Sequence, residues 1–222
     1  MPTTSPNDEP IHSPTKSVGL TVCSHTGVSV RPALPSGAAS IANVHIRSWQ
    51  WAYAGLMPAS YLDNLAPSLE RRTQRWLDRL SAPASNNPTV TLVPELDNEV
   101  VAFASLDPPR DKIFTTAEME LTSLYLHLHA AGQGIGRALM DVIKNEIRHL
   151  GMHHATLWVL DTNERARRFY EREGWRVTKD VKVETVGTMD LREANTKGTE
   201  NLSTEEARCE AGAAPASRRI SS

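Results

Sequence analysis

The sequence predicts a single α/β domain with a loose segment at each end. Short apolar runs of strand length alternate along the chain with longer segments in which apolar residues recur every third or fourth position, as in helices that lie on a sheet. The chain has 222 residues, of which 40% are hydrophobic and 23% are charged, and this fits one globular core. The domain is expected to span residues 28–193.

The two ends of the chain differ from the domain in composition. Residues 1–27 are rich in Ser, Thr and Pro, and residues 194–222 finish in Ala, Gly and Ser, so both ends are expected to be disordered. Cys23 and Cys209 lie in these ends and form no CxxC pair, which makes a reducing cytoplasm the expected compartment.

Charge and hydropathy exclude two classes of partner. The formal net charge is -2, so no global field attracts nucleic acid or an anionic membrane. No apolar run approaches the length of a membrane span. We therefore expect neither a nucleic-acid nor a membrane partner.

The first part of the domain predicts one strand and two helices. Residues 28–31 form the strand, and Ser36 is expected to cap the helix that follows. The residues that recur at helical spacing there are Ile41, Val44, Ser48 and Trp51. Gly55 and Pro58 end this helix, and a second one is expected over 68–80. Its apolar face is predicted to hold Leu69, Trp76, Leu77 and Leu80.

The middle of the domain predicts a hairpin and a central strand. Residues 89–94 and 99–106 pair around an Asp97-Asn98 turn. The polar stretches 82–88 and 107–116 are expected to be loops, and residues 118–126 form the central strand.

The last part of the domain predicts two helices and three strands. The first helix starts at Ile135 and ends at Gly151, with its apolar residues on one face. They are Ile135, Leu139, Val142, Ile143, Ile147 and Leu150. A buried strand over 155–160 leads into a short helix that Gly174 ends. Two weaker strands follow, roughly 175–183 and 185–192.

A glycine-rich turn joins the central strand to the helix that starts at Ile135. It runs Gly132-Gln133-Gly134-Ile135-Gly136-Arg137-Ala138. A helix start offers unpaired backbone N–H groups and the positive end of the macrodipole, and glycines let an anion approach them. The turn therefore predicts a phosphate or pyrophosphate site. Neither G-x-G-x-x-G nor G-x-x-x-x-G-K-[ST] fits its spacing, so the flanking residues must identify the ligand.

The flanking residues resemble the acetyl-CoA signature of the GCN5-related N-acetyltransferase (GNAT) family. Gly134 and Gly136 match the glycines of that pattern, Arg or Gln, two residues, Gly, any residue, Gly or Ala. Ala131 stands at its first position and removes one side chain from the loop, whereas most pyrophosphate contacts in the family come from backbone N–H groups. Residues 157–175 look like the second conserved block of the family, and 41–58 look like the first helices of bacterial members.

The resemblance, which covers residues 28–193, implies a fold and a co-substrate. The GNAT-type acyl-CoA N-acyltransferase fold is a mixed, mostly antiparallel sheet with helices on both faces, and its two central parallel strands splay apart. The pantetheine arm of acetyl-CoA enters this gap and pairs with a strand backbone. The cofactor-binding residues that the resemblance implies are Leu124, Leu126, Gly132, Gln133, Gly134, Ile135, Gly136, Arg137, Ala138 and Asn163.

Several of these residues have a specific expected role. By resemblance, the backbone N–H of Leu126 stabilises the oxyanion, and the side chain of Asn163 bonds the pantetheine amide while it also caps its helix. Gln133 and Arg137 would reach the phosphates. Arg137 has the alternative of being a solvated residue in the first helical turn.

Two catalytic groups follow from the same resemblance. Glu120 lies six residues before Leu126 on the central strand, so it is expected to share that residue's face and to take the proton of the amine. Its alternative is a solvated carboxylate. Tyr170 is expected to protonate the sulfur of CoA, since the pKa values of a phenol and a thiol differ by only ~1.5 units. Its alternative is a core tyrosine beside Phe169.

The acceptor of the acetyl group is expected to be a primary amine on a small molecule, a peptide or a protein. By resemblance, the aromatic residues near the first two helices wall the acceptor site; they are Trp49, Trp51, Tyr53 and Tyr61. No metal site is predicted, because His127 and His129 have no further ligands at a suitable spacing. Dimers are common in the family, so a homodimer is one expectation for the oligomeric state.

Two other functions compete with an N-acetyltransferase. A non-catalytic acyl-CoA sensor with the same fold would keep the binding loop and lose nothing when Glu120 and Tyr170 are replaced. A different nucleotide-binding α/β protein would bind ATP or NAD in place of CoA. A primary-amine acetyltransferase that acts by direct attack in a ternary complex is the leading hypothesis.

Overall fold

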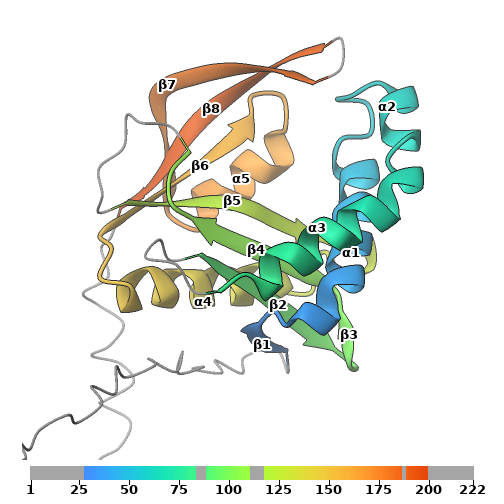
Figure 1. The fold of residues 1–222 in the computed structure, drawn as a ribbon. Coiled ribbons are helices and arrows are strands. Elements are labelled where there is room, and N and C mark those ends of the chain that lie inside the picture. The colour runs from blue at the N-terminus through green and yellow to red at the C-terminus, as the bar shows by residue number, and fades with distance from the viewer. Residues whose placement is uncertain (1–27, 84–88, 111–117, 187–188, 200–222) are drawn as a thin grey trace, which may run out of the picture.

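The computed structural model describes residues 28–83, 89–110, 118–186 and 189–199 of the chain. They form an eight-stranded sheet in which the path of neighbouring strands is β1-β2-β4-β5-β6-β8-β7, with β3 paired to β2 (Figure 1). The strands are β1 (Ser29–Pro32), β2 (Val90–Leu96), β3 (Glu99–Val100), β4 (Ala102–Asp107), β5 (Glu118–Leu126), β6 (His154–Leu160), β7 (Trp175–Val186) and β8 (Met189–Thr199). The helices are α1 (Ala38–Ala52), α2 (Ala59–Asp63), α3 (Leu69–Ser81), α4 (Ile135–His149) and α5 (Glu164–Arg172), with single 3-10 turns η1 (Pro35–Gly37), η2 (Ala66–Ser68) and η3 (Leu128–Ala130).

The sheet is mixed and mostly antiparallel, as predicted. Among the described strands, only β5 and β6 pair in parallel. Their pairing covers Glu118 to Glu120 on β5 and stops there, although β5 continues to Leu126 and β6 to Leu160. The two central strands therefore part beyond Glu120, and the predicted splay is confirmed.

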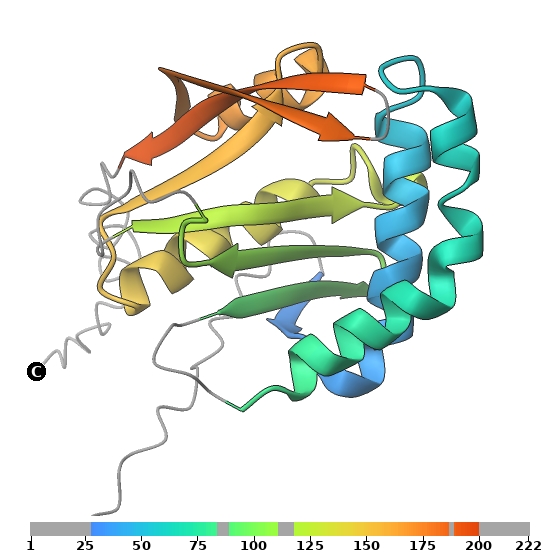
Figure 2. The same ribbon diagram turned by 45° about the horizontal axis from the view of Figure 1, so that its top comes forward.

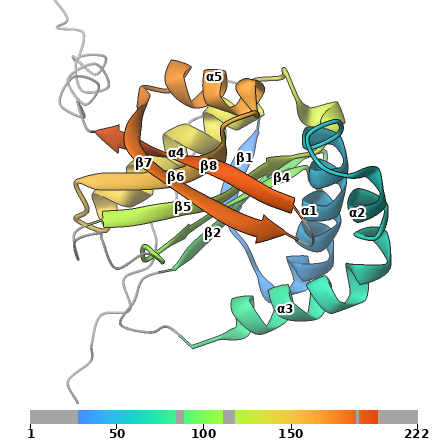
Figure 3. The same cartoon turned by 90° about the horizontal axis from the view of Figure 1, so that it is seen from above.

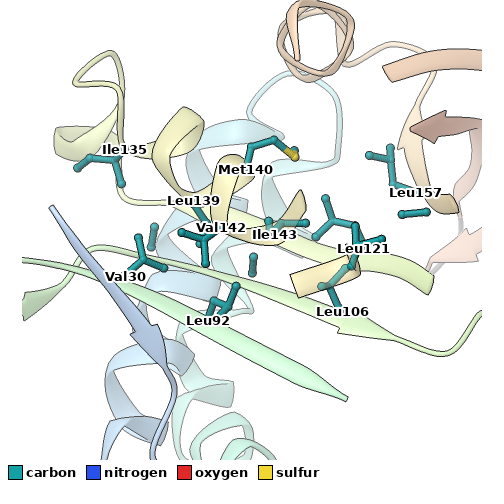
Figure 4. Close-up of a cluster of buried hydrophobic side chains, with 14 of the residues drawn as sticks. Val30, Leu92, Leu106, Leu121, Ile135, Leu139, Met140, Val142, Ile143 and Leu157 are labelled. Carbon is teal, nitrogen blue, oxygen red and sulfur yellow. The ribbon is translucent and has the colours of Figure 1, made fainter. Parts of the chain in front are cut away.

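Helices cover both faces of the sheet, and Figure 3 shows α3 and α4 on opposite sides of it. The helix α4 lays an apolar stripe that includes Leu139 and Ile143 on β2, β4, β5 and β6, where it meets Leu92, Leu106 and Leu157 (Figure 4). On the other face, Ile41 and Val44 of α1 pack against β2 and β4 in a smaller cluster. The predicted apolar face of the helix after the glycines is confirmed.

The Asp97-Asn98 turn is confirmed as well. Both residues have positive φ, 51° and 65°, and this is the backbone that a tight two-residue hairpin turn needs. Asn and Asp tolerate the left-handed region better than other non-glycine residues. The turn therefore fixes how β2 returns to β3 and β4.

Two predictions about the N-terminal helices were wrong, and one short helix was missed. Ser36 does not cap a helix, because residues 35–37 form a 3-10 turn and Gly37 stands at the N-cap of α1. Leu69 and Leu77 are exposed by 40% and 37%, because only a narrow stripe of α3 with Trp76 and Leu80 faces the core. The short helix α2 was not anticipated.

The predicted C-terminal boundary of the domain was also wrong. Residues 194–199 do not belong to a tail, because they form the second half of β8 between β6 and β7. Ala194, Asn195 and Thr196 are buried there. The other residues of the two predicted tails, 1–27 and 200–222, lie outside the described residues, as do parts of the predicted loops 82–88 and 107–116.

A β-bulge on the central strand decides where the side chain of Glu120 points. The register between β4 and β5 shifts so that Ser105 opposes Ser123 whereas Leu106 opposes Leu121, which leaves Thr122 as an extra residue. Leu126 and Leu121 consequently face the same core beneath α4. Glu120 lies on the opposite face, so the expectation that it shares the face of Leu126 was wrong.

Candidate active site

The gap between β5 and β6 exposes backbone groups of β5. The N–H of His127 donates to the carbonyl of Val101 at 2.9 Å. Because bonding alternates along an antiparallel pair, the N–H and C=O groups of Leu126 and Leu124 turn away from β4 and toward the gap. The carbonyl of Leu126 accepts a hydrogen bond from Ser48 of α1 at 2.7 Å, which fixes α1 to this edge.

The glycine loop lies at the same end of β5, at the start of α4. Gly132 and Gly134 have φ near +80°, and Gly134 is the N-cap of α4. The first helical hydrogen bond runs from the N–H of Ala138 to the carbonyl of Gly134 at 3.0 Å. The N–H groups of Ile135, Gly136 and Arg137 therefore precede the helical bonding pattern and point out of the helix end. Residues 132–134 are exposed, so an anion can reach these groups.

The side chains around the loop differ in their roles: some stabilise the loop, and others are exposed to solvent. Gln133 donates its amide to the carbonyl of His129 at 2.6 Å, and this contact steadies the turn. Arg137 is exposed, whereas the side chain of Ile135 is buried in the core. A Cβ at Gly136 would lie 3.4 Å from the ring of Phe169, so the absence of a side chain lets α4 approach α5.

The start of α5 forms the other wall of this region. Asn163 caps the helix by accepting the N–H of Ala166 at 3.1 Å, as predicted, which leaves its side-chain amide to donate elsewhere. A groove of about 520 Å³ runs between this helix and the turn after α1. Its lining residues are Ala52, Ala54, Leu56, Thr162, Asn163, Glu164, Arg165, Arg168 and Arg172. The guanidinium of Arg165 lies 3.8 Å from the centre of the Trp51 ring, and this contact ties α5 to α1.

Three tyrosines gather at the gap. Burial raises the pKa of Tyr170 on α5, and neighbouring Tyr125 of β5 adds to the shift. Burial also raises the pKa of Tyr53 at the end of α1, again with a contribution from Tyr125. For Tyr125, burial raises the pKa, and the neighbouring side chains of Tyr53 and Trp49 oppose this shift. The three phenols therefore stay protonated at neutral pH, so Tyr170 has a proton to donate at the gap.

Glu120 is fully buried and is held by Arg110. One carboxylate oxygen accepts the backbone N–H of Arg110 at 3.0 Å, and the other accepts its Nε at 3.0 Å and its Nη2 at 2.6 Å. This arrangement is neither of the two situations expected from the sequence, since the carboxylate is neither solvated nor open to an amine. Whether Glu120 acts as a base stays a prediction.

Sequence reasoning missed a partly buried histidine behind this site. The imidazole of His45 on α1 stacks on Tyr125, with ring centres 5.2 Å apart, and it meets Phe103 edge-on at 5.6 Å. Burial, with the nearby charge of Arg72, lowers the pKa of His45 from 6.5 to about 4. His45 follows Val44, which lies on the predicted apolar face of α1. A single sequence gives no sign that aromatic rings surround the imidazole.

The lowered pKa of His45 predicts a loss of stability in acid. The unfolded chain binds a proton at His45 near pH 6.5, whereas the folded chain binds it only near pH 4. The free energy of unfolding therefore keeps its full value above pH 6.5 and decreases as the pH falls from 6.5 to 4. The loss attributable to His45 is about 3 kcal/mol. Urea unfolding at pH 7 and pH 4.5 measures it, and His45→Gln is expected to flatten the difference. An equal difference in both proteins would contradict this expectation.

Comparisons with known proteins agree with the geometry. Residues 45–175 match the Acetyltransferase (GNAT) family, so the chain belongs to this family and is an acyltransferase. It is 28% identical over 136 residues to the uncharacterized N-acetyltransferase YuaI of Bacillus subtilis, which covers 61% of this chain and 73% of that protein. It is 36% identical over 80 residues to an uncharacterized N-acetyltransferase of Archaeoglobus fulgidus, 36% of this chain and 54% of the other.

Solved structures show the same fold. The PaiA N-acetyltransferase of Thermoplasma acidophilum in complex with coenzyme A matches with a TM-score of 0.61 and 20% identity, over 78% of this chain and 99% of that one. A GCN5-related N-acetyltransferase of Rhodopseudomonas palustris matches with a TM-score of 0.60 and 21% identity, over 78% of this chain and 95% of that one.

In the described ranges, no helix is both long and apolar enough to cross a membrane.

Proposed function

We propose that the chain transfers the acetyl group of acetyl-CoA to a primary amine by direct attack in a ternary complex. The observation that carries this proposal is the alignment of two features at one end of β5. The outward backbone groups of Leu124 and Leu126 are followed, after one 3-10 turn, by the exposed amides at the start of α4. A ligand with an extended amide arm and a diphosphate fits both, and coenzyme A is such a ligand.

Each part of the co-substrate would have its own partners. The diphosphate would bind the N–H groups of Ile135, Gly136 and Arg137, with the helix dipole behind them. The pantetheine arm would add to the free edge of β5 and reach Asn163. The groove beside α5 carries three arginines and one glutamate, Glu164, which pairs with Arg168, and its net positive charge favours a ligand with several phosphate groups.

The chemistry would take place deeper in the gap. The amine attacks the carbonyl carbon of the thioester, and the N–H of Leu126 stabilises the negative charge that develops on the oxygen. The carbon–sulfur bond then breaks, and Tyr170 gives the leaving thiolate its proton. Positioning and fixed dipoles supply most of the acceleration, so no covalent intermediate on the protein is required.

The test has two steps. Calorimetric titration with CoA, ATP and NAD is expected to show binding of CoA alone, because only CoA combines the diphosphate with the amide arm. Release of free thiol from acetyl-CoA in the presence of a panel of amines then reports turnover. Tight binding of ATP or NAD would overturn the ligand assignment, and CoA binding without turnover on any amine would favour the acyl-CoA sensor.

A further inference from the structure

A second carboxylate shares the sheet face of Glu120 and lies beyond the gap. Thr156 of β6 is level with Glu120, and Leu160 follows four residues later on the same face. Glu193 of β8 pairs with Leu160, so its side chain points to this face too. Its charge acts on Tyr53 and Tyr125, which places Glu193 within electrostatic reach of the tyrosines at the gap. Glu193 lay at the last position of the predicted domain and was not singled out in the sequence.

A group of aromatic rings on α1, α2 and β5 includes the two tyrosines on which the charge of Glu193 acts. Trp49 contacts Tyr53, Tyr61 and Tyr125 with ring centres 5.0, 6.5 and 6.3 Å apart, and each of the four side chains is partly exposed. We call these four residues the aromatic wall. Figure 2 shows the β7–β8 hairpin reaching toward the loop between α1 and α2, and Leu191 of this hairpin packs on the same helices. The hairpin thus brings Glu193 to the aromatic wall.

Glu193 is in a different state from Glu120. Its side chain is 20% exposed, and within the part of the chain that the structure describes it forms one ion pair, with Lys182. The ammonium of Lys182 lies 3.3 Å from Glu193 and 4.5 Å from the centre of the Trp158 ring. Burial raises the pKa of Glu193, Lys182 opposes this shift, and the like charge of Glu184 adds to it. Arg110 also lies within electrostatic range, but it is bound to Glu120. Glu193 is therefore a carboxylate that solvent can reach, with enhanced basicity.

We propose that Glu193 and the aromatic wall form the acceptor site, which binds a primary amine with an aromatic group. The carboxylate binds the ammonium and removes its proton, and the aromatic group packs against the wall. This inference rests on the proposed acetyl transfer and adds its acceptor class and its base. The wall favours such an amine because ring contacts and cation–π attraction both stabilise it.

The ammonium gives one proton to Glu193, which passes it to water. The freed nitrogen lone pair forms the bond to the acetyl carbon, and the carbon–sulfur electron pair leaves with the sulfur. The sulfur takes a proton from Tyr170, and Tyr170 regains one from the attacking nitrogen as it becomes the amide. Ammonium and acetyl-CoA thus give amide, CoA thiol and one released proton.

The test compares Glu193→Gln with Asp190→Asn, which removes a carboxylate charge from an exposed position of the same hairpin. With 2-phenylethylamine and acetyl-CoA, Glu193→Gln is expected to lower kcat/KM about 100-fold at pH 7, the usual size of a lost general base. The loss is expected to shrink as pH approaches about 10, where alkylamines deprotonate unaided. Asp190→Asn is expected to keep the native rate, and both variants are expected to keep the native affinity for CoA.

Two further variants separate a catalytic from a structural role. Glu193→Asp is expected to restore part of the rate, because it restores a carboxylate. Lys182→Met is expected to move the acidic limb of the pH profile to higher pH, because the ammonium that lowers the pKa of Glu193 is gone. A rate loss in Glu193→Gln that is equal at every pH would overturn the base assignment.

The proposed class of acceptor is tested separately, by comparing two amines as substrates. Acetylation of spermidine by the native chain without acetylation of 2-phenylethylamine would overturn the acceptor site while the proposed acetyltransferase function stands. A native chain that binds no CoA would instead remove the proposed function, and this inference with it.

Discussion

Gly134→Glu is expected to weaken the binding of CoA about 1000-fold. Gly134 stands at the N-cap of α4, directly before the amide groups that would hold the diphosphate. A carboxylate there lies about 4 Å from the diphosphate, and two like charges at that distance near a protein surface repel by about 4 kcal/mol. A tenfold change in affinity corresponds to about 1.4 kcal/mol, so the repulsion alone gives this loss. Isothermal titration with CoA measures it.

Two control variants separate charge from backbone strain. Gly134→Asn keeps the φ of +80°, which Asn tolerates better than most residues, and adds no charge. Gly151→Glu adds the same charge at a left-handed glycine beyond the other end of α4, where a Cβ meets open space. Both are expected to bind CoA within about tenfold of the native chain, with a melting temperature near that of Gly134→Glu. Native-like affinity for CoA in a folded Gly134→Glu protein would contradict the assignment of the diphosphate site to this loop.

Elements with a strong local pattern could be predicted from the sequence. The central strand was expected over 118–126 and β5 has the same bounds, because this segment is rich in apolar residues and lies between a polar stretch and the glycine-rich turn. The helix α4 was predicted with its start at Ile135, because the glycines mark the turn and the apolar residues then recur at helical spacing. The glycine-rich turn was located for the same reason, because its exposed amide groups belong to its own backbone.

The position of Glu120 could not be predicted, because a bulge is a property of two strands. The period of two along β5 alone puts Glu120 on the face of Leu126. The shift appears only in the register with β4, where Leu106 pairs with Leu121. One extra residue then moves every side chain on the N-terminal side of it to the opposite face. An alternation pattern read from one strand carries no sign of this.

The second half of β8 was missed because its residues suit a tail. Ala194, Asn195 and Gly198 are poor strand formers, and stability comes instead from pairing with strands on both sides. Gly198 has a packing reason, since a Cβ there would lie 3.1 Å from the ring of Trp175. Glu193 directly precedes this missed segment. Its role depends on its position near the tyrosines of α1 and β5, which the sequence does not show.

Replacing Tyr170 by Phe is expected to lower kcat about 100-fold, with the affinity for CoA unchanged. The variant removes one hydroxyl and keeps the ring that packs between Phe169 and Trp175, with ring centres 5.4 and 6.2 Å away. Removal of a general acid costs at least about 100-fold in rate. Because burial raises the pKa of Tyr170, this residue adds no basic limb to the native pH profile below about pH 10. Stopped-flow thiol release under saturating acetyl-CoA measures kcat.

The split between kcat and binding distinguishes a proton donor from a core tyrosine. A core tyrosine would contribute through packing, so its Phe variant would change the melting temperature and leave kcat as it was. A proton donor would change kcat and leave the melting temperature and the Kd of CoA as they were. A native kcat in Tyr170→Phe would assign the proton to solvent or to Tyr125, the neighbouring phenol whose pKa is also raised by burial. Tyr125→Phe in the same assay then separates these two sources, because only a donor at Tyr125 makes its rate fall.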